Sequence, residues 1–207
     1  MLGLLSPTEA HAGDLPLEHR PKTLSSKGGY KINPAEQAHR KQVSNEYVTN
    51  LKSQENSKLK PGKLIFANKP PEDAPKGEMD IAFGHKITPA ERKSGKIYGI
   101  PWKKGITYKQ AETILRKDIE VHANKAKKYL RKKGANFDRL DPTIQEVLID
   151  YSFTGALTKF PKFVDAVINN DWATIEKEFK RYYTSKGKRK ELVRRNKMIK
   201  EMLDKTK

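Results

Sequence analysis

The chain contains no cysteine, so neither a disulfide framework nor a thiolate metal site can form. Its five histidines are scattered without a metal-ligand spacing such as H-E-x-x-H; they are His11, His19, His39, His85 and His122. We therefore expect no metal centre and no cofactor. No apolar run approaches the roughly 20 residues that a membrane helix needs, so we expect no membrane span. The apolar residues 1–5 lack a basic segment and are followed by Pro7 and Glu9, which argues against a secretion signal.

Acidic residues are scarce beside basic ones. The chain has 25 Asp and Glu against 43 Lys and Arg, which gives a formal net charge of +18. A positive field of this kind raises the local concentration of polyanions and speeds encounters with them. Nucleic acid, an anionic cell envelope and acidic proteins are therefore candidate partners, and the charge alone does not choose among them.

Apolar periodicity is almost absent from residues 1–33, which carry Pro7, Pro16 and Pro21 among polar residues. A segment of this composition does not bury enough apolar surface to fold alone. We therefore predict two parts. Residues 1–33 form an extended arm that docks on a partner, and residues 34–207 form a folded domain.

The folded domain is predicted to be mainly helical and of the α+β class. Asn33 and Pro34 suit the start of a helix that runs to about Glu55. Strand fragments are expected only at residues 64–66 and 80–83. Further helices are expected at the capping box of Thr107 and Gln110, at Pro142, at Pro161, over residues 172–182 with Tyr182 on the inner face, and over residues 192–203. These patterns predict a small mixed lobe and a helical C-terminal lobe.

Four segments of the chain resemble, in order, motifs of phage-type lysozymes. Residues 79–87 (M-D-I-A-F-G-H-K-I) resemble the family's T-I-G-Y-G-H segment, and residues 105–115 its G-I-T…Q-A-E-x-L-L helix start. Residues 150–157 resemble its F-x-F-N-x-G segment, and residues 192–195 its L-V-R-R-R segment. The resemblance spans roughly residues 45–204. It implies a lysozyme-like fold and an enzyme that cuts the glycan strands of peptidoglycan.

The same resemblance gives Glu55 the role of general acid. The run K-S-Q-E-N at residues 52–56 is similar to the family's K-S-x-E-G, with Asn56 in place of glycine. Breaking a glycosidic bond requires a proton on the leaving oxygen while an oxocarbenium-like charge develops. A carboxyl group in a partly apolar cleft can hold that proton near neutral pH. The alternative is that Glu55 is a surface carboxylate near a helix end.

The second carboxylate departs from the family pattern. The family places a threonine where this chain has Asp80, and its aspartate follows the glutamate after a shorter loop than the one that carries Asp73. Our hypothesis is that Asp80 acts as a base for the attacking water or as a nucleophile. Asp73 is the alternative, and Glu78 is a third carboxylate in the same region.

The remaining matched residues are expected to shape the site. By resemblance, His85 orders the active-site lobe through hydrogen bonds, and Gly84 supplies a backbone conformation that side chains disfavour. Thr154 and Gly155 match the segment in which a helix ends beside the cleft. We expect none of these four residues to react with substrate.

The expected function is a muramidase that hydrolyses the bond between N-acetylmuramic acid and N-acetylglucosamine. We expect it in a phage virion, as a tail or ejected component docked on other virion proteins through residues 1–33 and acting in the host periplasm or cell wall. One alternative is a soluble endolysin that waits in the host cytoplasm for release by a holin. Another is a lysozyme-like structural virion protein without activity. A further alternative is nucleic-acid binding through the basic residues 186–200, although that run has no recognisable motif and no interleaved aromatic residues.

Overall fold

The longest element of the described chain is the 25-residue helix α4 (Tyr108–Lys132) in this computed structural model. The structure describes residues 43–68, 78–185 and 188–206, which all belong to one unit, Arg40–Lys207. The predicted arm, residues 1–33, and the candidate Asp73 lie outside the described residues.

Helices dominate the described residues, and short antiparallel sheets accompany them. The other α-helices are α2 (Asn45–Asn56), α3 (Pro89–Ser94), α5 (Pro142–Phe153), α6 (Pro161–Asn169), α7 (Trp172–Glu178) and α8 (Val193–Asp204), with 3₁₀ turns at Phe137–Arg139 and Leu157–Lys159. The two-stranded sheets pair β1 (Asp80–Ile81) with β2 (His85–Lys86), β3 (Lys96–Ile97) with β4 (Ile100–Pro101), and β5 (Tyr182–Ser185) with β6 (Lys188–Glu191). The α+β, mainly helical class is therefore confirmed. None of the helices in the described ranges is long and apolar enough to cross a membrane.

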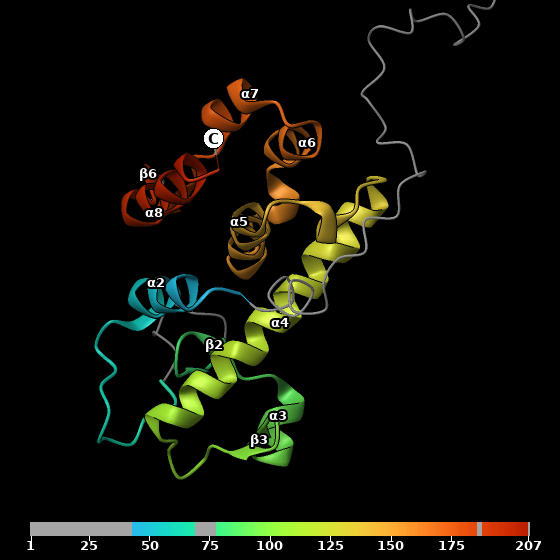
Figure 1. Cartoon of the computed structure of the whole chain (residues 1–207). Helices are drawn as coiled ribbons and strands as arrows, with labels where there is room; N and C mark the ends of the chain where they lie inside the picture. The colour runs from blue at the N-terminus through green and yellow to red at the C-terminus, as the bar shows by residue number, and fades with distance from the viewer. Residues whose placement is uncertain (1–42, 69–77, 186–187, 207) are drawn as a thin grey trace, which may run out of the picture. The chain divides into compact units, whose positions relative to one another are not determined.

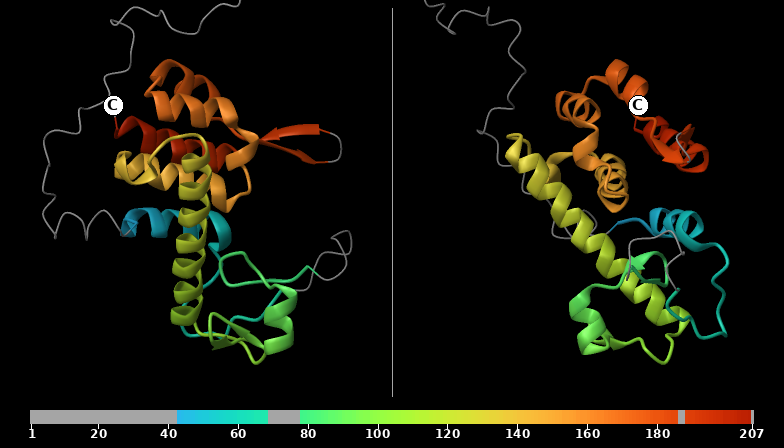
Figure 2. Two further views of the ribbon diagram at one scale, coloured as in Figure 1. Left: turned by 90° about the vertical axis from the view of Figure 1, so that its right-hand side faces the viewer. Right: turned by 180° about the vertical axis from the view of Figure 1, so that it is seen from behind.

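Helix α4 starts at the predicted capping box. Thr107 accepts the backbone N–H of Gln110, and the Gln110 side chain accepts that of Thr107, which satisfies two otherwise unpaired donors. Its buried positions recur at helical spacing and are Ala111, Ile114, Leu115, Asp118, Ile119, Ala126 and Leu130. Figures 1 and 2 show α4 running from the β1–β4 segments at one end to the helices α5 and α6 at the other. This helix therefore joins the small lobe to the helical lobe.

Helix α2 begins later than predicted. Val43 and Ser44 are not helical, and the Ser44 hydroxyl accepts the backbone N–H of Tyr47 at 3.0 Å, as an N-cap does. A continuous helix from Pro34 is therefore wrong for the element that carries Glu55. The predicted buried face is present: Tyr47, Val48 and Leu51 are buried.

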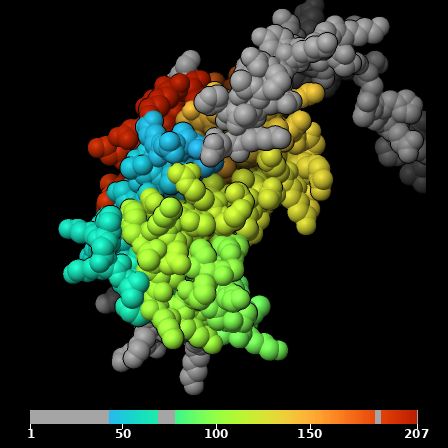
Figure 3. Space-filling view, turned by 60° about the horizontal axis from the view of Figure 1, so that its bottom comes forward, coloured from blue at the N-terminus to red at the C-terminus, as the bar shows by residue number. Residues whose placement is uncertain are grey.

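The segment after α2 crosses to the start of α4. Of the expected strand at residues 64–66, only an isolated bridge forms, between Ile65 and Ile106. Figure 3 shows this segment, in cyan, against the yellow-green start of α4. A second bridge joins Asn68 to Asp80 in β1. These contacts hold the chain after Glu55 against the small lobe.

The helix predicted over residues 172–182 is wrong in its second half. Helix α7 ends at Glu178, and Tyr182 lies in β5 with 38% of its surface exposed rather than on an inner face. The run Tyr182-Tyr183-Thr184 has the aromatic and β-branched residues that favour strands. The β5–β6 hairpin projects from the helices in the left view of Figure 2.

Candidate active site

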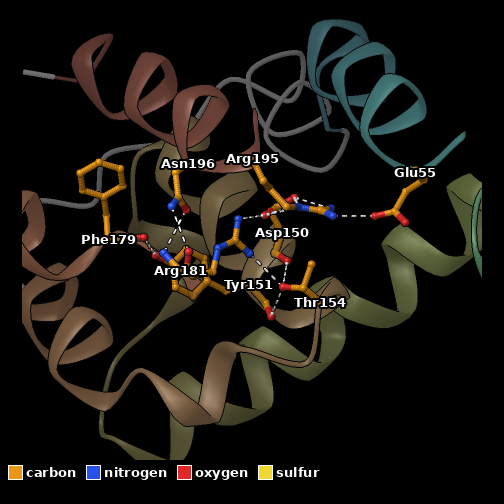
Figure 4. Close-up of polar contacts among 8 residues, drawn as sticks. All are labelled: Glu55, Asp150, Tyr151, Thr154, Phe179, Arg181, Arg195 and Asn196. Atoms are coloured by element: carbon orange, nitrogen blue, oxygen red, sulfur yellow. Dashed lines mark hydrogen bonds and ion pairs between the residues drawn. The ribbon is translucent and has the colours of Figure 1, made fainter. Parts of the chain in front are cut away.

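Glu55 lies in the last turn of α2, and its side chain is 20% exposed. Its Oε1 atom accepts a hydrogen bond from Nη1 of Arg195 at 2.8 Å, as Figure 4 shows. Arg195 comes from α8, which is 140 residues further along the chain. A charge-assisted bond of this length fixes one oxygen of the carboxylate.

Arg195 in turn reaches a buried carboxylate, Asp150 of α5. Its Nη2 atom lies 2.9 Å from Oδ1 of Asp150, and its Nε atom lies 3.1 Å from the same oxygen. Asp150 has no exposed surface. Burial lowers the pKa of Arg195, but the charge and hydrogen bonds of Asp150, followed by those of Glu55, outweigh burial and raise it. Arg195 therefore stays charged between the two carboxylates.

A second arginine completes the network around Asp150. Nη2 of Arg181 lies 2.6 Å from Oδ2 of Asp150, and its Nη1 donates to the Thr154 hydroxyl at 2.9 Å. The backbone of Arg181 is held by Asn196, which exchanges hydrogen bonds of 2.9 and 3.0 Å with its N–H and C=O groups. The Arg181 guanidinium also stacks 4.4 Å from the ring centre of Tyr151. All of these residues are drawn in Figure 4.

The turn between β1 and β2 packs against the other oxygen of Glu55. A Cβ atom built on Gly84 would lie 3.1 Å from Oε2 of Glu55, and Gly84 has a φ of +85°. Ala82, in the same turn, also has a positive φ of 60°, which is uncommon for a residue with a side chain. The side-chain amide of Asn56 donates to the Ala82 carbonyl at 3.4 Å. Gly84 therefore gives the Glu55 carboxylate the room that a side chain would take.

The structure does not bring Asp80 into contact with Glu55. Asp80 is exposed in β1, and its Oδ1 accepts the side-chain amide of Asn68 at 2.6 Å. Among the described residues, no hydrogen bond or ion pair joins Asp80 to Glu55. Glu78 is exposed and pairs with Lys86 at 2.9 Å. With Asp73 outside the described residues, the second carboxylate stays unassigned.

His85 is held by carboxylates of the small lobe and of α4. Its Nδ1 lies 2.9 Å from Oδ1 of Asp118, and its Nε2 lies 3.3 Å from Oε2 of Glu91. The Tyr98 hydroxyl donates to the same Asp118 oxygen at 2.7 Å. Burial lowers the pKa of His85, but the hydrogen bonds and charges of Asp118 and Glu91 raise it overall. These contacts tie β2, α3 and α4 together.

Thr154 and Gly155 form the end of α5. The Thr154 hydroxyl donates to the carbonyl of Asp150 at 3.0 Å and accepts from Arg181, so it belongs to the charged network. Gly155 has a φ of +66°, the left-handed conformation that often ends a helix.

Asp150, Arg181 and Arg195 were not predicted as site residues. The sequence does contain a signal for Asp150, which lies between Ile149 and Tyr151 in an apolar helix. A carboxylate in such a position is expected to be buried, and a buried charge is almost always paired with an opposite one. Its partners lie 31 and 45 residues away, and no sequence pattern links them.

The chain matches no protein-family model, no curated protein and no solved structure. The part of the chain that the structure describes contains no group of three or more His, Asp or Glu side chains that could hold a metal ion.

Proposed function

We propose that the chain is a peptidoglycan muramidase with a lysozyme-like fold and Glu55 as its general acid. One observation carries this proposal. Glu55 ends α2 with its side chain partly exposed, one oxygen paired to Arg195 and the other beside Gly84. A carboxyl group that is fixed on one oxygen and faces a residue without a side chain on the other suits proton delivery to a substrate oxygen. The order of the four lysozyme-like segments supports the same function.

The proposed reaction adds water across the bond between N-acetylmuramic acid and N-acetylglucosamine. Glu55 donates a proton to the leaving oxygen while positive charge develops on the muramic acid ring. Asp80 or Asp73 supplies the second carboxylate, either to take a proton from the attacking water or to attack the sugar directly. The side-chain amide of Asn68 donates a hydrogen bond to Oδ1 of Asp80 at 2.6 Å, which leaves its other oxygen, Oδ2, for this proposed role.

The test is mass spectrometry of the fragments that the full chain releases from purified peptidoglycan. We expect the wild type to release fragments with reducing N-acetylmuramic acid ends and Glu55→Gln to release none. Glu120→Gln is the matched control, because Glu120 is exposed and pairs only with Lys117 on α4 among the described residues. Equal release by wild type and Glu55→Gln would overturn the assignment of the acid.

A second variant tests the partner carboxylate. We expect Asp80→Asn to slow cleavage about 100-fold or more, as loss of a catalytic carboxylate does. An unchanged rate moves the role to Asp73, for which Asp73→Asn is the next variant.

The second candidate function is a lysozyme-like structural protein without activity, and the Glu55–Arg195 ion pair favours it. The pair ties Glu55 to Arg195 and, through Arg195, to the buried Asp150, an arrangement that a purely structural carboxylate would also have. A folded wild type that releases nothing from several wall types would support this candidate. For either candidate we propose that residues 1–33 dock on other virion proteins, and detection of the chain in purified phage particles tests that location.

A further inference from the structure

A cavity of about 340 Å³ lies in the helical lobe, between the start of α5, the end of α6, the start of α7 and the C-terminal end of the described chain. Its volume falls within the range of roughly 300–1,000 Å³ that is usual for small-molecule sites. The described lining residues are Leu140, Asp141, Ile144, Val167, Asn170, Trp172, Ile175 and Thr206. None of them belongs to the charged network of Glu55, so the proposed reaction does not use this cavity.

The lining of the cavity carries little charge. Its described residues include no lysine or arginine, although the chain has 43 of them and a formal net charge of +18. The one charged lining residue is Asp141, whose Oδ1 accepts the backbone N–H groups of Thr143 and Ile144 at the start of α5. A phosphate or another anion would meet no cation here, so the ligand that fits is neutral.

The cavity has an apolar floor and a polar edge. Ile144, Val167 and Ile175 are buried, whereas Asp141 and Asn170 are exposed. Trp172 is only partly buried and adds an indole ring, which offers a large apolar face and one N–H donor. A sugar ring has the complementary construction, because its faces consist of C–H bonds and its edge carries hydroxyl groups.

Three hydrogen-bonding groups of the lining have no protein partner among the described residues. They are the side-chain amide of Asn170, the indole N–H of Trp172 and the Oδ2 atom of Asp141. The amide both donates and accepts, the indole donates, and the carboxylate oxygen accepts. An acetamido group also donates and accepts, and its methyl group suits an apolar floor. These groups together match a sugar that carries an acetamido substituent.

We propose that this cavity binds an N-acetylhexosamine residue of a glycan, with a face of the sugar ring against Trp172 and the acetamido group beside Asn170. The site holds a glycan on the helical lobe and takes no part in bond cleavage. It goes beyond the proposed muramidase reaction, because binding here requires neither Glu55 nor a second carboxylate.

The experiment titrates the ¹⁵N-labelled full chain with N-acetylglucosamine and follows the indole N–H signals by NMR. The chain has two tryptophans, and Trp102 is the internal control because it is 8% exposed and donates its indole N–H to the Glu91 carbonyl at 3.2 Å. The signal that is missing in Trp172→Phe identifies Trp172. We expect that signal to shift in a saturable manner with a Kd of roughly 1 to 10 mM, as for a small neutral ligand. The Trp102 signal should not move, and glucose, which lacks the acetamido group, should bind at least about threefold more weakly.

Asn170→Gly is the site variant. Asn170 ends α6 with a φ of 55°, a conformation that glycine adopts readily, so the variant removes the amide and keeps the helix end. We expect it to bind N-acetylglucosamine about threefold to tenfold more weakly, the usual effect of losing one hydrogen bond. The matched control is Asn124→Ala, which removes an exposed amide from α4 and should leave the affinity unchanged.

Three outcomes would overturn the proposal. A Trp172 signal that does not respond, in a chain whose Trp102 signal shows that it is folded, would mean that the cavity binds no amino sugar. Equal affinity for glucose would exclude recognition of the acetamido group. Equal affinity of Asn170→Gly and the wild type would place the ligand away from Asn170. None of these outcomes bears on Glu55, whose role is tested by the release of glycan fragments.

Discussion

The most constrained residue of the candidate site is Asp150. Its carboxylate is fully buried between two guanidinium groups, and Glu55 supplies the second negative charge that balances them. Two positive and two negative side chains therefore form a neutral set at the junction of α2, α5 and α8. Because an unpaired charge in the interior is costly, removal of one member should destabilise the others. The orientation of Glu55 thus depends on Arg195 and, through Arg195, on the buried Asp150.

Substitution Asp150→Ala should lower the free energy of unfolding by about 3 to 5 kcal/mol, the usual cost of breaking a buried ion pair. It leaves Arg181 without its carboxylate and Arg195 with Glu55 alone. Urea unfolding followed by circular dichroism measures the change. The control is Asp165→Ala, which removes an exposed pair with Lys133 and should cost at most about 1 kcal/mol. Equal effects at the two positions would show that the network contributes no more than a surface pair.

Substitution Gly84→Ala should disturb Glu55 directly. The new Cβ would lie 3.1 Å from the Glu55 carboxylate, and the backbone there has a φ of +85°. Gly99→Ala is a matched control, because Gly99 has a φ of +84° and open space around its Cβ position. Both variants should lose about 1 kcal/mol of stability from backbone strain.

Under the proposed muramidase function, only Gly84→Ala should also lower the rate of glycan cleavage, by about tenfold or more, because a small displacement of the proposed general acid is costly. Turnover assays on purified peptidoglycan compare the two variants at a temperature where both are folded. A similar loss of turnover in Gly99→Ala would attribute the effect to backbone strain and not to the contact with Glu55.

At the scale of elements, the sequence predicted the helix starts that depend on residues close together in the chain. The capping box at Thr107 and the Asp141–Pro142 start of α5 each depend on residues within one helical turn, and both are present in the structure. The β5–β6 hairpin was missed because the periodicity of residues 172–179 continues through Tyr182. What ends the helix is distant, since Arg181 turns inward to Asp150. The role of Glu55 comes from resemblance and stays a prediction, whereas its charged partners Arg195 and Asp150 could be identified only from the fold.

The contacts of His85 predict how the small lobe responds to pH. The folded protein holds the His85 proton more tightly than the unfolded chain does, because Asp118 and Glu91 outweigh burial and raise its pKa from 6.5. This stabilisation is complete below the unfolded value and is lost as the pH rises through the folded pKa. The free energy of unfolding of the wild type, relative to His85→Gln, should therefore fall as the pH rises from about 6.5 through the raised pKa of His85. Urea titrations across that range measure the difference.

His122 provides a control of opposite sign. Burial, followed by the charge of Lys125, lowers the pKa of His122 to about 4. Its contribution is present above the unfolded pKa and is lost as the pH falls toward about 4. The difference between wild type and His122→Gln should therefore shrink with falling pH. A stability difference for His85→Gln that grows with rising pH would contradict the role of its carboxylate partners.

At the scale of the whole molecule, the formal net charge of +18 opposes folding through self-repulsion. The described exposed pairs offset little of this, because surface ion pairs contribute at most about 1 kcal/mol each. The network of Asp150 is buried and is therefore little affected by added salt. Screening should consequently weaken repulsion between exposed lysines and arginines more than it weakens the attractions that stabilise the fold.

We therefore expect the melting temperature of the full chain to rise by roughly 3 to 6 °C between about 20 and about 200 mM sodium chloride, equivalent to about 1 to 2 kcal/mol for a chain of this size. Differential scanning calorimetry measures the change, and chloride is used because sulfate also strengthens apolar burial. A variant of β6, Lys188→Gln/Arg189→Gln/Lys190→Gln, should show a smaller rise, since it lacks three neighbouring exposed cations. A melting temperature that falls with salt would mean that screened attractions outweigh repulsion, and the positive charge would then be balanced within the folded chain rather than left available for a partner.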